Sequence, residues 1–260
     1  MQPLQIVLGY TGTGLSWTIR GVAGVYYREI SNIWQNHELI TLRRAGLGDP
    51  HLRHYHSSHI SDRKHQKSVE PIEVELILWG HSQGGIEALW QLLRSRLPSN
   101  VRIVAVFLLS APLHGSPAAD LAAPLELVPW PISTLFTGIT QMRPDSRSER
   151  ALHDKLRVTM QRSDFCHPPL YLVGAQHDHL VPLESAWNIV PDLEYPAEKL
   201  HLVRLIHGDA EAYDGVHDVQ VSWGLDSHIG MPTSSDLHHF MAGVVGHDHP
   251  LLNAKYGFAA

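Results

Sequence analysis

The sequence is poor in several features that would define a function directly. It has one cysteine, Cys166, so no disulfide bond can form within the chain and the fold cannot depend on one. No apolar run is long enough to span a bilayer, so we expect no transmembrane segment. Basic residues form no patch and the net charge is −6, so we expect no nucleic-acid partner.

The length and the N-terminus set the expected organisation. A chain of 260 residues suits one large α/β domain, and no repeat or linker divides it. We therefore predict a single domain over residues 1–260. Residues 1–3 lead directly into an apolar segment without the pattern of a signal peptide. We expect a cytoplasmic protein, or a secreted one if a signal peptide has been removed, and the sequence leaves the oligomeric state open.

The most informative stretch runs from Val74 to Leu93. Residues 74–79 are an apolar run of strand length, and apolar residues from Ile86 onward recur at helical spacing. Between them lies Gly-x-Ser-x-Gly, with Ser82 at its centre. A serine on a sharp strand-to-helix turn brings the residues two before and two after it close together, which requires glycine there. The turn also directs the N-terminus of the helix at an oxygen that becomes negative during acyl transfer.

Residues 80–85, Gly-His-Ser-Gln-Gly-Gly, resemble the nucleophile elbow of α/β-hydrolases, and of their lipase branch in particular. The resemblance implies the α/β-hydrolase fold, which is a mainly parallel sheet with helices on both faces and a small cap insertion. It further implies that the first strand of this chain is the third of the usual eight. Ser82 would be the nucleophile.

The remaining elements are predicted from apolar runs and helical periodicity. The predicted strands are 4–8, 37–42, 101–109, 170–174 and 199–206, and the predicted helices outside the central stretch are 17–33 and 148–161.

A glycine-rich loop follows the first strand. It lacks the spacing of a dinucleotide-binding motif, and no Walker lysine follows it. In hydrolases this loop supplies an oxyanion donor. The resemblance assigns the backbone N–H groups of Tyr10 and Gln83 to the oxyanion hole, with Thr11 as the alternative to Tyr10.

The acid and the base of a triad are expected after later strands. Asp178 lies in a stretch that resembles the hydrolase acid loop, Gly-x-x-Asp-x-x-Val-Pro. His207, His217 and His228 are the candidates for the base. We favour His228 because residues 228–241 resemble the ending of small lipases, with a capped terminal helix. On this interpretation residues 208–225 are an inserted loop, whose acidic residues form either a solvated loop or a calcium site.

Two further segments have alternative interpretations. Residues 113–148 contain apolar residues among prolines, which suits a cap or lid over the site or an irregular part of the core. His114 in this segment is predicted to shape the acyl pocket. Residues 51–65 contain five histidines, which suit a solvated loop or a zinc site. No cysteine and no convincing carboxylate partner completes a ligand set there, with Asp62 and His65 as the best available pair, so we predict no metal and no organic cofactor.

These observations predict a serine hydrolase that cleaves carboxylic esters of small molecules or lipids through Ser82, Asp178 and His228. A thioesterase or an amidase with the same triad is the alternative among enzymes. A binding protein with a hydrolase fold and no useful turnover is the alternative from another class. Acyl length and the physiological substrate stay open at this point.

Overall fold

The computed structural model describes residues 4–11, 33–34, 38–43, 73–94, 97, 99–122, 142–144, 146–189 and 194–246. The strands are β1 Leu4–Thr11, β2 Glu38–Arg43, β3 Val74–His81, β4 Val101–Leu109, β5 Leu170–Ala175, β6 Leu200–Ile206 and β7 Val216–Gln220. The helices are α3 Gln83–Arg94, α4 Pro117–Ala122, α6 Arg147–Met160, α7 Leu183–Trp187 and α8 Ser235–Val244, with short 3₁₀ turns η4 Ala197–Lys199 and η5 Met231–Thr233.

In the part of the chain that the structure describes, the strands form one sheet in the order β2-β1-β3-β4-β5-β6-β7. Every neighbouring pair is parallel. The carboxyl ends of parallel strands meet at one edge of a sheet, and this is where α/β proteins place their sites. The turn after β3, the loop after β5 and the loop after β7 therefore lie on the same side of the molecule.

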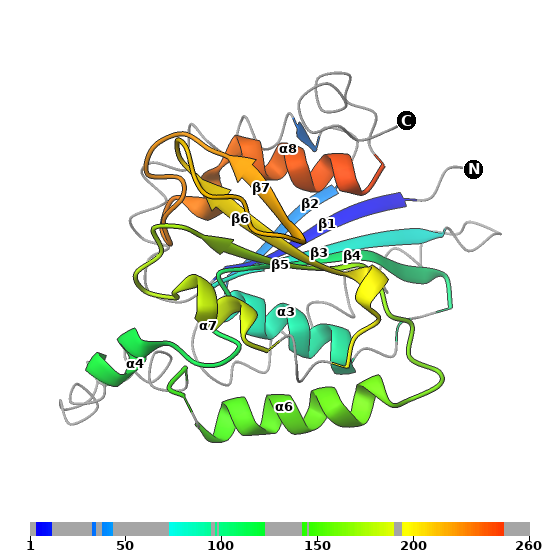
Figure 1. Cartoon of the computed structure of the whole chain (residues 1–260). Helices are drawn as coiled ribbons and strands as arrows, with labels where there is room; N and C mark the ends of the chain where they lie inside the picture. Colours follow the sequence, from blue (N-terminus) through cyan, green and yellow to red (C-terminus); the bar gives the residue numbers. More distant parts are fainter. Residues whose placement is uncertain are drawn as a thin grey trace.

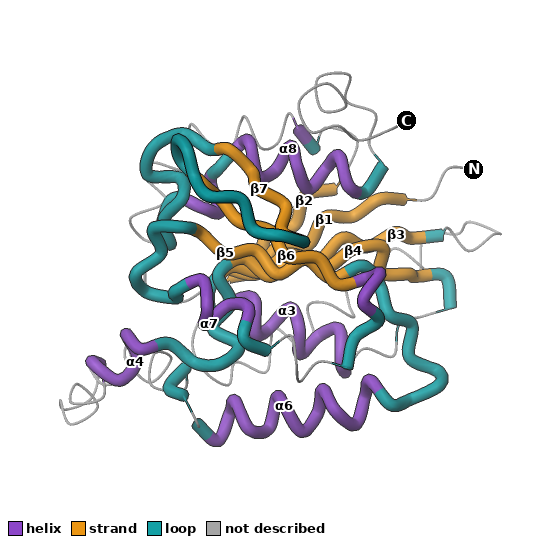
Figure 2. Tube along the Cα trace, in the orientation of Figure 1, coloured by secondary structure: helices purple, strands orange, loops and turns teal. Residues whose placement is uncertain are grey.

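Helices cover both faces of the sheet, as predicted (Figure 1). In β3 the side chains alternate: Leu76 and Leu78 pack with α3 and α6, whereas Ile77 and Trp79 pack with α8 on the opposite face. A strand buried on both faces has to be apolar throughout, which explains the continuous apolar runs of β3 and β4. Figure 2 shows how the sheet separates these two helical layers.

Most predicted elements are confirmed to within one residue. Strand β4 has the predicted bounds, β5 and β6 differ by one residue at one end, and β2 is shifted by one residue. Helix α6 is also shifted by one residue. Strand β1 runs to Thr11, so three residues predicted to lie in the loop after it belong to the sheet.

The interpretation of residues 208–225 as an inserted loop is wrong. They contain β7, which pairs in parallel with β6 and makes β6 an inner strand of the sheet. The buried Arg204 of β6 explains the pairing. Its Nε donates to Asp218 Oδ1 of β7 at 2.8 Å, and a terminal guanidinium nitrogen donates to Oδ2 at 2.7 Å. A polar strand is held here by a bidentate ion pair, which no hydrophobic pattern reveals.

Three predictions fall largely or wholly on residues outside those described. They are the helix 17–33, of which only the last residue is described, the histidine-rich segment 51–65, and the greater part of the proposed cap. Within 113–148 the structure describes residues 113–122, which include α4, and residues 142–144 and 146–148.

None of the described helices has the length and apolar character needed to cross a membrane.

Candidate active site

Ser82 occupies the turn between β3 and α3 with φ +57°. This left-handed conformation is strained for a residue with a side chain, and such strain is concentrated at functional sites. Two hydrogen bonds hold the turn: the Ser82 N–H donates to Leu109 O of β4 at 2.8 Å, and the Ser82 carbonyl accepts from Gly85 N at 2.9 Å. The backbone of Ser82 is thus fixed to the neighbouring strand and to the first turn of the helix.

Glycine is required at position 80 by close backbone approach. A Cβ on Gly80 would lie 2.3 Å from the carbonyl oxygen of Gly84, closer than real Cβ contacts allow. The blocking atom belongs to the backbone, so it has no side-chain freedom to move away. The tight turn around Ser82 therefore depends on the absence of a side chain two residues before it.

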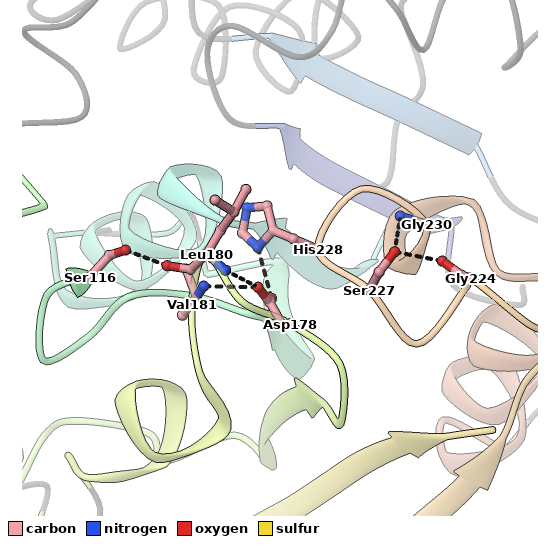
Figure 3. Close-up of polar contacts among 8 residues, drawn as sticks. All are labelled: Ser116, Asp178, Leu180, Val181, Gly224, Ser227, His228 and Gly230. Atoms are coloured by element: carbon pink, nitrogen blue, oxygen red, sulfur yellow. Dashed lines mark hydrogen bonds and ion pairs between the residues drawn. The ribbon is translucent and has the colours of Figure 1, made fainter. Parts of the chain in front are cut away.

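Asp178 and His228 lie together at the same edge of the sheet (Figure 3). His228 Nδ1 and Asp178 Oδ2 are 2.8 Å apart, and both residues are buried. The second carboxylate oxygen, Oδ1, accepts from the backbone N–H groups of Leu180 at 2.9 Å and Val181 at 2.8 Å. Because both oxygens have donors, the carboxylate has a fixed orientation toward the imidazole.

Two opposing effects act on the pKa of Asp178. Burial alone would raise it, because a charged carboxylate is poorly solvated in the interior. The hydrogen bond and the charge of His228, followed by the side chain of Ser110 and the backbone donor Val181, outweigh burial and lower the pKa below its usual value. Asp178 therefore stays ionised at neutral pH, and an ionised carboxylate requires a proton on Nδ1 of the imidazole.

His81 links this pair to the serine turn. Its ring lies beside that of His228, with ring centroids 4.7 Å apart, and it directly precedes Ser82. Burial, and then the charge of His228, lower the pKa of His81 to about 3. The imidazole beside His228 is therefore neutral and adds no positive charge there.

The other candidate histidines do not contact Asp178. His207 is exposed and its Nδ1 is 3.2 Å from Val221 O. His217 lies on β7, near the rings of His201 and Phe240. The structure thus brings Asp178 together with His228, and places His207 and His217 elsewhere.

The predicted oxyanion donors are backbone groups at two strand ends. Gln83 is the first residue of α3, and the first N–H groups of a helix have no acceptor within it. Tyr10 pairs with Gly80 in the register of β1 and β3, and Thr11 is the last residue of β1. The start of α3 and the end of β1 therefore both lie beside the turn that carries Ser82.

A second histidine–carboxylate pair was not predicted. His177 Nδ1 is 2.5 Å from Asp226 Oδ2, and the His177 N–H donates to Asp226 O at 3.1 Å. His177 adjoins Asp178 and Asp226 lies two residues before His228, so this pair joins the loop after β5 to the loop after β7. Ser227 restrains the latter loop by donating to Gly224 O at 2.5 Å (Figure 3). The sequence gives no signal for this link, because the loops meet only after the sheet forms.

Apolar side chains adjoin the pair on the outside. Leu180 is 40% exposed, Ile229 is 48% exposed, and Trp223 in the preceding loop is 84% exposed. Leu180 and Ile229 follow Asp178 and His228 closely in the chain, so exposed apolar residues belong to the same two loops as the buried polar pair.

Within the described ranges, one group of side chains has the composition and spacing of a metal site. It consists of His114, Glu149 and His153, each offering one ligand atom within 4.8 Å of the other two. His114, predicted to shape an acyl pocket, therefore faces α6.

No protein-family model matches the sequence, and no curated protein sequence matches it. Solved structures do resemble the fold. An esterase from Pyrococcus furiosus aligns over 98% of this chain and 82% of its own, with a TM-score of 0.52 and 14% identity. A soluble variant of monoglyceride lipase from Saccharomyces cerevisiae, in complex with a substrate analogue, aligns over 95% and 87%, with a TM-score of 0.53 and 11% identity.

At these identities the likeness concerns the fold. The order of the parallel strands and the helices on both faces agree with it. The chain therefore has the α/β-hydrolase fold.

Proposed function

We propose that this protein is a serine hydrolase that cleaves carboxylic esters, with lipase-like acyl substrates favoured. The observation that carries the proposal is the buried 2.8 Å contact between His228 Nδ1 and Asp178 Oδ2. The ring of His228 also lies beside that of His81, which directly precedes Ser82. A strained serine, an imidazole and an ionised carboxylate at one edge of a parallel sheet are the parts that acyl transfer requires.

In the proposed mechanism His228 Nε2 takes the Ser82 proton as Oγ attacks the ester carbonyl. Asp178 holds the proton on Nδ1 and stabilises the imidazolium that forms. The N–H of Gln83 and one N–H at the end of β1, that of Tyr10 or Thr11, stabilise the oxyanion. The alcohol leaves with the proton from His228, and an acyl-enzyme remains. Water then attacks this ester with His228 as base, which releases the acid and restores Ser82.

The substrate class is supported by surface chemistry near the site. The exposed Leu180 and Ile229 border it, and apolar side chains favour an apolar acyl chain by removing it from water. The two structural neighbours named above are an esterase and a monoglyceride lipase, which agrees with ester substrates. All the groups in the proposed chemistry are protein groups, so no cofactor is assigned to it.

The decisive experiment combines active-site labelling with matched serine variants. We expect a fluorophosphonate probe to label Ser82 in the folded protein, as located by peptide mass spectrometry. Ser82→Ala should remove labelling and lower p-nitrophenyl ester hydrolysis by a factor on the order of 10⁴–10⁶. Ser222→Ala, at an exposed serine, should change neither.

The same assay separates the alternatives. A panel of p-nitrophenyl esters from two to sixteen carbons measures acyl preference, and matched thioesters and anilides test for a thioesterase or an amidase. Ser82→Ala protein that retains more than a few per cent of wild-type activity would disprove the assignment of the nucleophile. Folded wild-type protein that labels no faster than denatured protein would favour a binding protein.

A further inference from the structure

We propose that His114, Glu149 and His153 form a zinc site that ties the loop after β4 to helix α6. His114 lies in that loop, and the other two residues lie four apart on α6, so they share one helical face. One ligand atom from each lies within 4.8 Å of the other two. Ligands of a tetrahedral zinc ion are about 3.4 Å apart, so small side-chain movements would close the site.

The carboxylate of Glu149 is the strongest reason to place a cation here. Its side chain is only 10% exposed, and Oε1 is 3.4 Å from His114 Nδ1. The other oxygen, Oε2, is buried and has no hydrogen-bond partner among the residues that the structure describes. A buried carboxylate oxygen without a donor is costly, and a bound cation would remove that cost.

The position of Glu149 in its helix makes this arrangement unusual. Ser146 caps α6 by accepting from Glu149 N at 3.1 Å, which places Glu149 at the third helical position of a capping box. A glutamate there ordinarily turns back to the N–H of the capping residue, but the Ser146 N–H donates to Arg143 O. The Glu149 side chain is directed instead toward the two imidazoles.

His153 is already oriented by the same loop. Its Nε2 is 3.0 Å from Leu113 O, and its ring stands at 88° to that of His114 with centroids 5.0 Å apart. Histidine ligands of metals commonly donate their second ring N–H to a backbone carbonyl. Coordination through Nδ1 would keep the bond to Leu113, and two imidazoles with one carboxylate leave a fourth position for water.

The site would act on the structure and not on the acyl-transfer step. The loop that carries His114 also supports the acid loop, because Ser116 Oγ donates to Leu180 O and Ser185 Oγ donates to Gly115 O. A zinc ion would fix this loop to α6. Its removal should therefore lower thermal stability while leaving ester hydrolysis at moderate temperature unchanged.

The test counts zinc sites in tag-free protein with a competing chromophoric chelator. The histidines of residues 51–65 could bind additional metal, so the difference between variants is the readout. His114→Ala and Glu149→Gln should each lose one equivalent, or weaken one site more than about tenfold, since loss even of an outer partner typically costs 10–100-fold. Glu184→Gln, in the first turn of α7, is the matched control and should bind as the wild type does.

Melting temperatures give a second readout that does not depend on activity. EDTA should lower that of the wild type and the Glu184→Gln protein, and should have little effect on Glu149→Gln or His114→Ala. His114 is only partly buried, so its variant keeps the test valid if Glu149→Gln fails to fold. Equal zinc binding by the wild type and the folded site variants would overturn the proposal, and the cluster would then be a direct contact between His114 and Glu149 without a metal. Absence of zinc binding by the wild type would also overturn it.

Discussion

At the scale of single residues, the candidate site depends on how neighbouring groups fix one imidazole. Asp178 accepts from His228 through Oδ2 and from two backbone N–H groups through Oδ1, so it cannot rotate without losing hydrogen bonds. His81 packs against the ring and stays neutral because burial lowers its pKa to about 3. The imidazole of His228 therefore has one preferred tautomer and one preferred orientation.

The first residue-scale prediction separates the candidate bases. His228→Ala should lower kcat for ester hydrolysis by a factor on the order of 10⁴–10⁶, because it removes the imidazole that accepts the serine proton in the proposed mechanism. His207→Ala should retain wild-type kcat, since His207 is exposed and its Nδ1 lies 3.2 Å from the backbone oxygen of Val221 instead of near Asp178. Steady-state kinetics on one ester decides the matter. The opposite pattern of losses would move the base to His207.

At the scale of elements, β7 shows how an ion pair stabilises a strand that the apolar pattern leaves undetected. Arg204 is almost fully buried, and its guanidinium donates to both oxygens of Asp218 and to Glu211 O. The ring of Tyr213 covers the guanidinium, with its centroid 4.4 Å from Arg204 Cζ. Hydrogen bonding to Asp218 is the main reason that the pKa of Arg204 is raised, so the cation persists.

We expect Asp218→Ala to lower the free energy of unfolding by about 3 kcal/mol, because it leaves a buried cation without its partner. Asp154→Ala is the matched control. Asp154 pairs with Arg157 on the surface of α6, where both side chains are mostly exposed and such pairs contribute about 0–1 kcal/mol. Urea unfolding followed by circular dichroism measures both. Equal losses in the two variants would show that the Arg204 pair does not hold β7 in place.

The difference between strands with apolar runs and a strand held by an ion pair explains which elements the sequence could predict. Strands buried on both faces, such as β3 and β4, have apolar runs that mark their bounds closely. Only Val219 of β7 is fully buried, so its residues look like those of a loop. Ser82, Asp178 and His228 could be proposed from local motifs, whereas the pair of His177 with Asp226 and the cluster around Glu149 depend on loops that meet only in the folded chain.

At the scale of the whole molecule, buried histidines couple stability to pH. His238 of α8 accepts from Trp34 Nε1 at Nδ1, 3.1 Å away, and its Nε2 is 3.1 Å from Pro232 O. Only the neutral imidazole with its proton on Nε2 satisfies both contacts, because a second proton would face the indole N–H. Burial accordingly lowers the pKa of His238 to about 4. Burial also lowers the pKa of His81, His167 and His201.

The sign of the effect follows from proton counting. An unfolded histidine titrates near pH 6.5, so between about pH 6.5 and 4 the unfolded chain binds protons that folded His81 and His238 do not bind. Stability therefore falls as pH falls through this window, by up to about 1.4 kcal/mol per pH unit for each such histidine. Asp178, whose pKa is lowered in the folded state, adds a further loss in the same direction below its unfolded pKa of about 4.

We therefore expect the free energy of unfolding, measured by urea titration, to fall steeply between pH 7 and pH 5. In His238→Gln the slope of this free energy against pH should be smaller, by the equivalent of about one proton. The comparison uses the pH slope of each variant, so it holds even if the loss of the contacts to Trp34 and Pro232 makes His238→Gln less stable at every pH. His207→Gln is the control, because an exposed histidine should leave the slope unchanged. A His238→Gln slope equal to that of the wild type would mean that folded His238 accepts a proton as readily as the unfolded chain, against the geometry of its two hydrogen bonds.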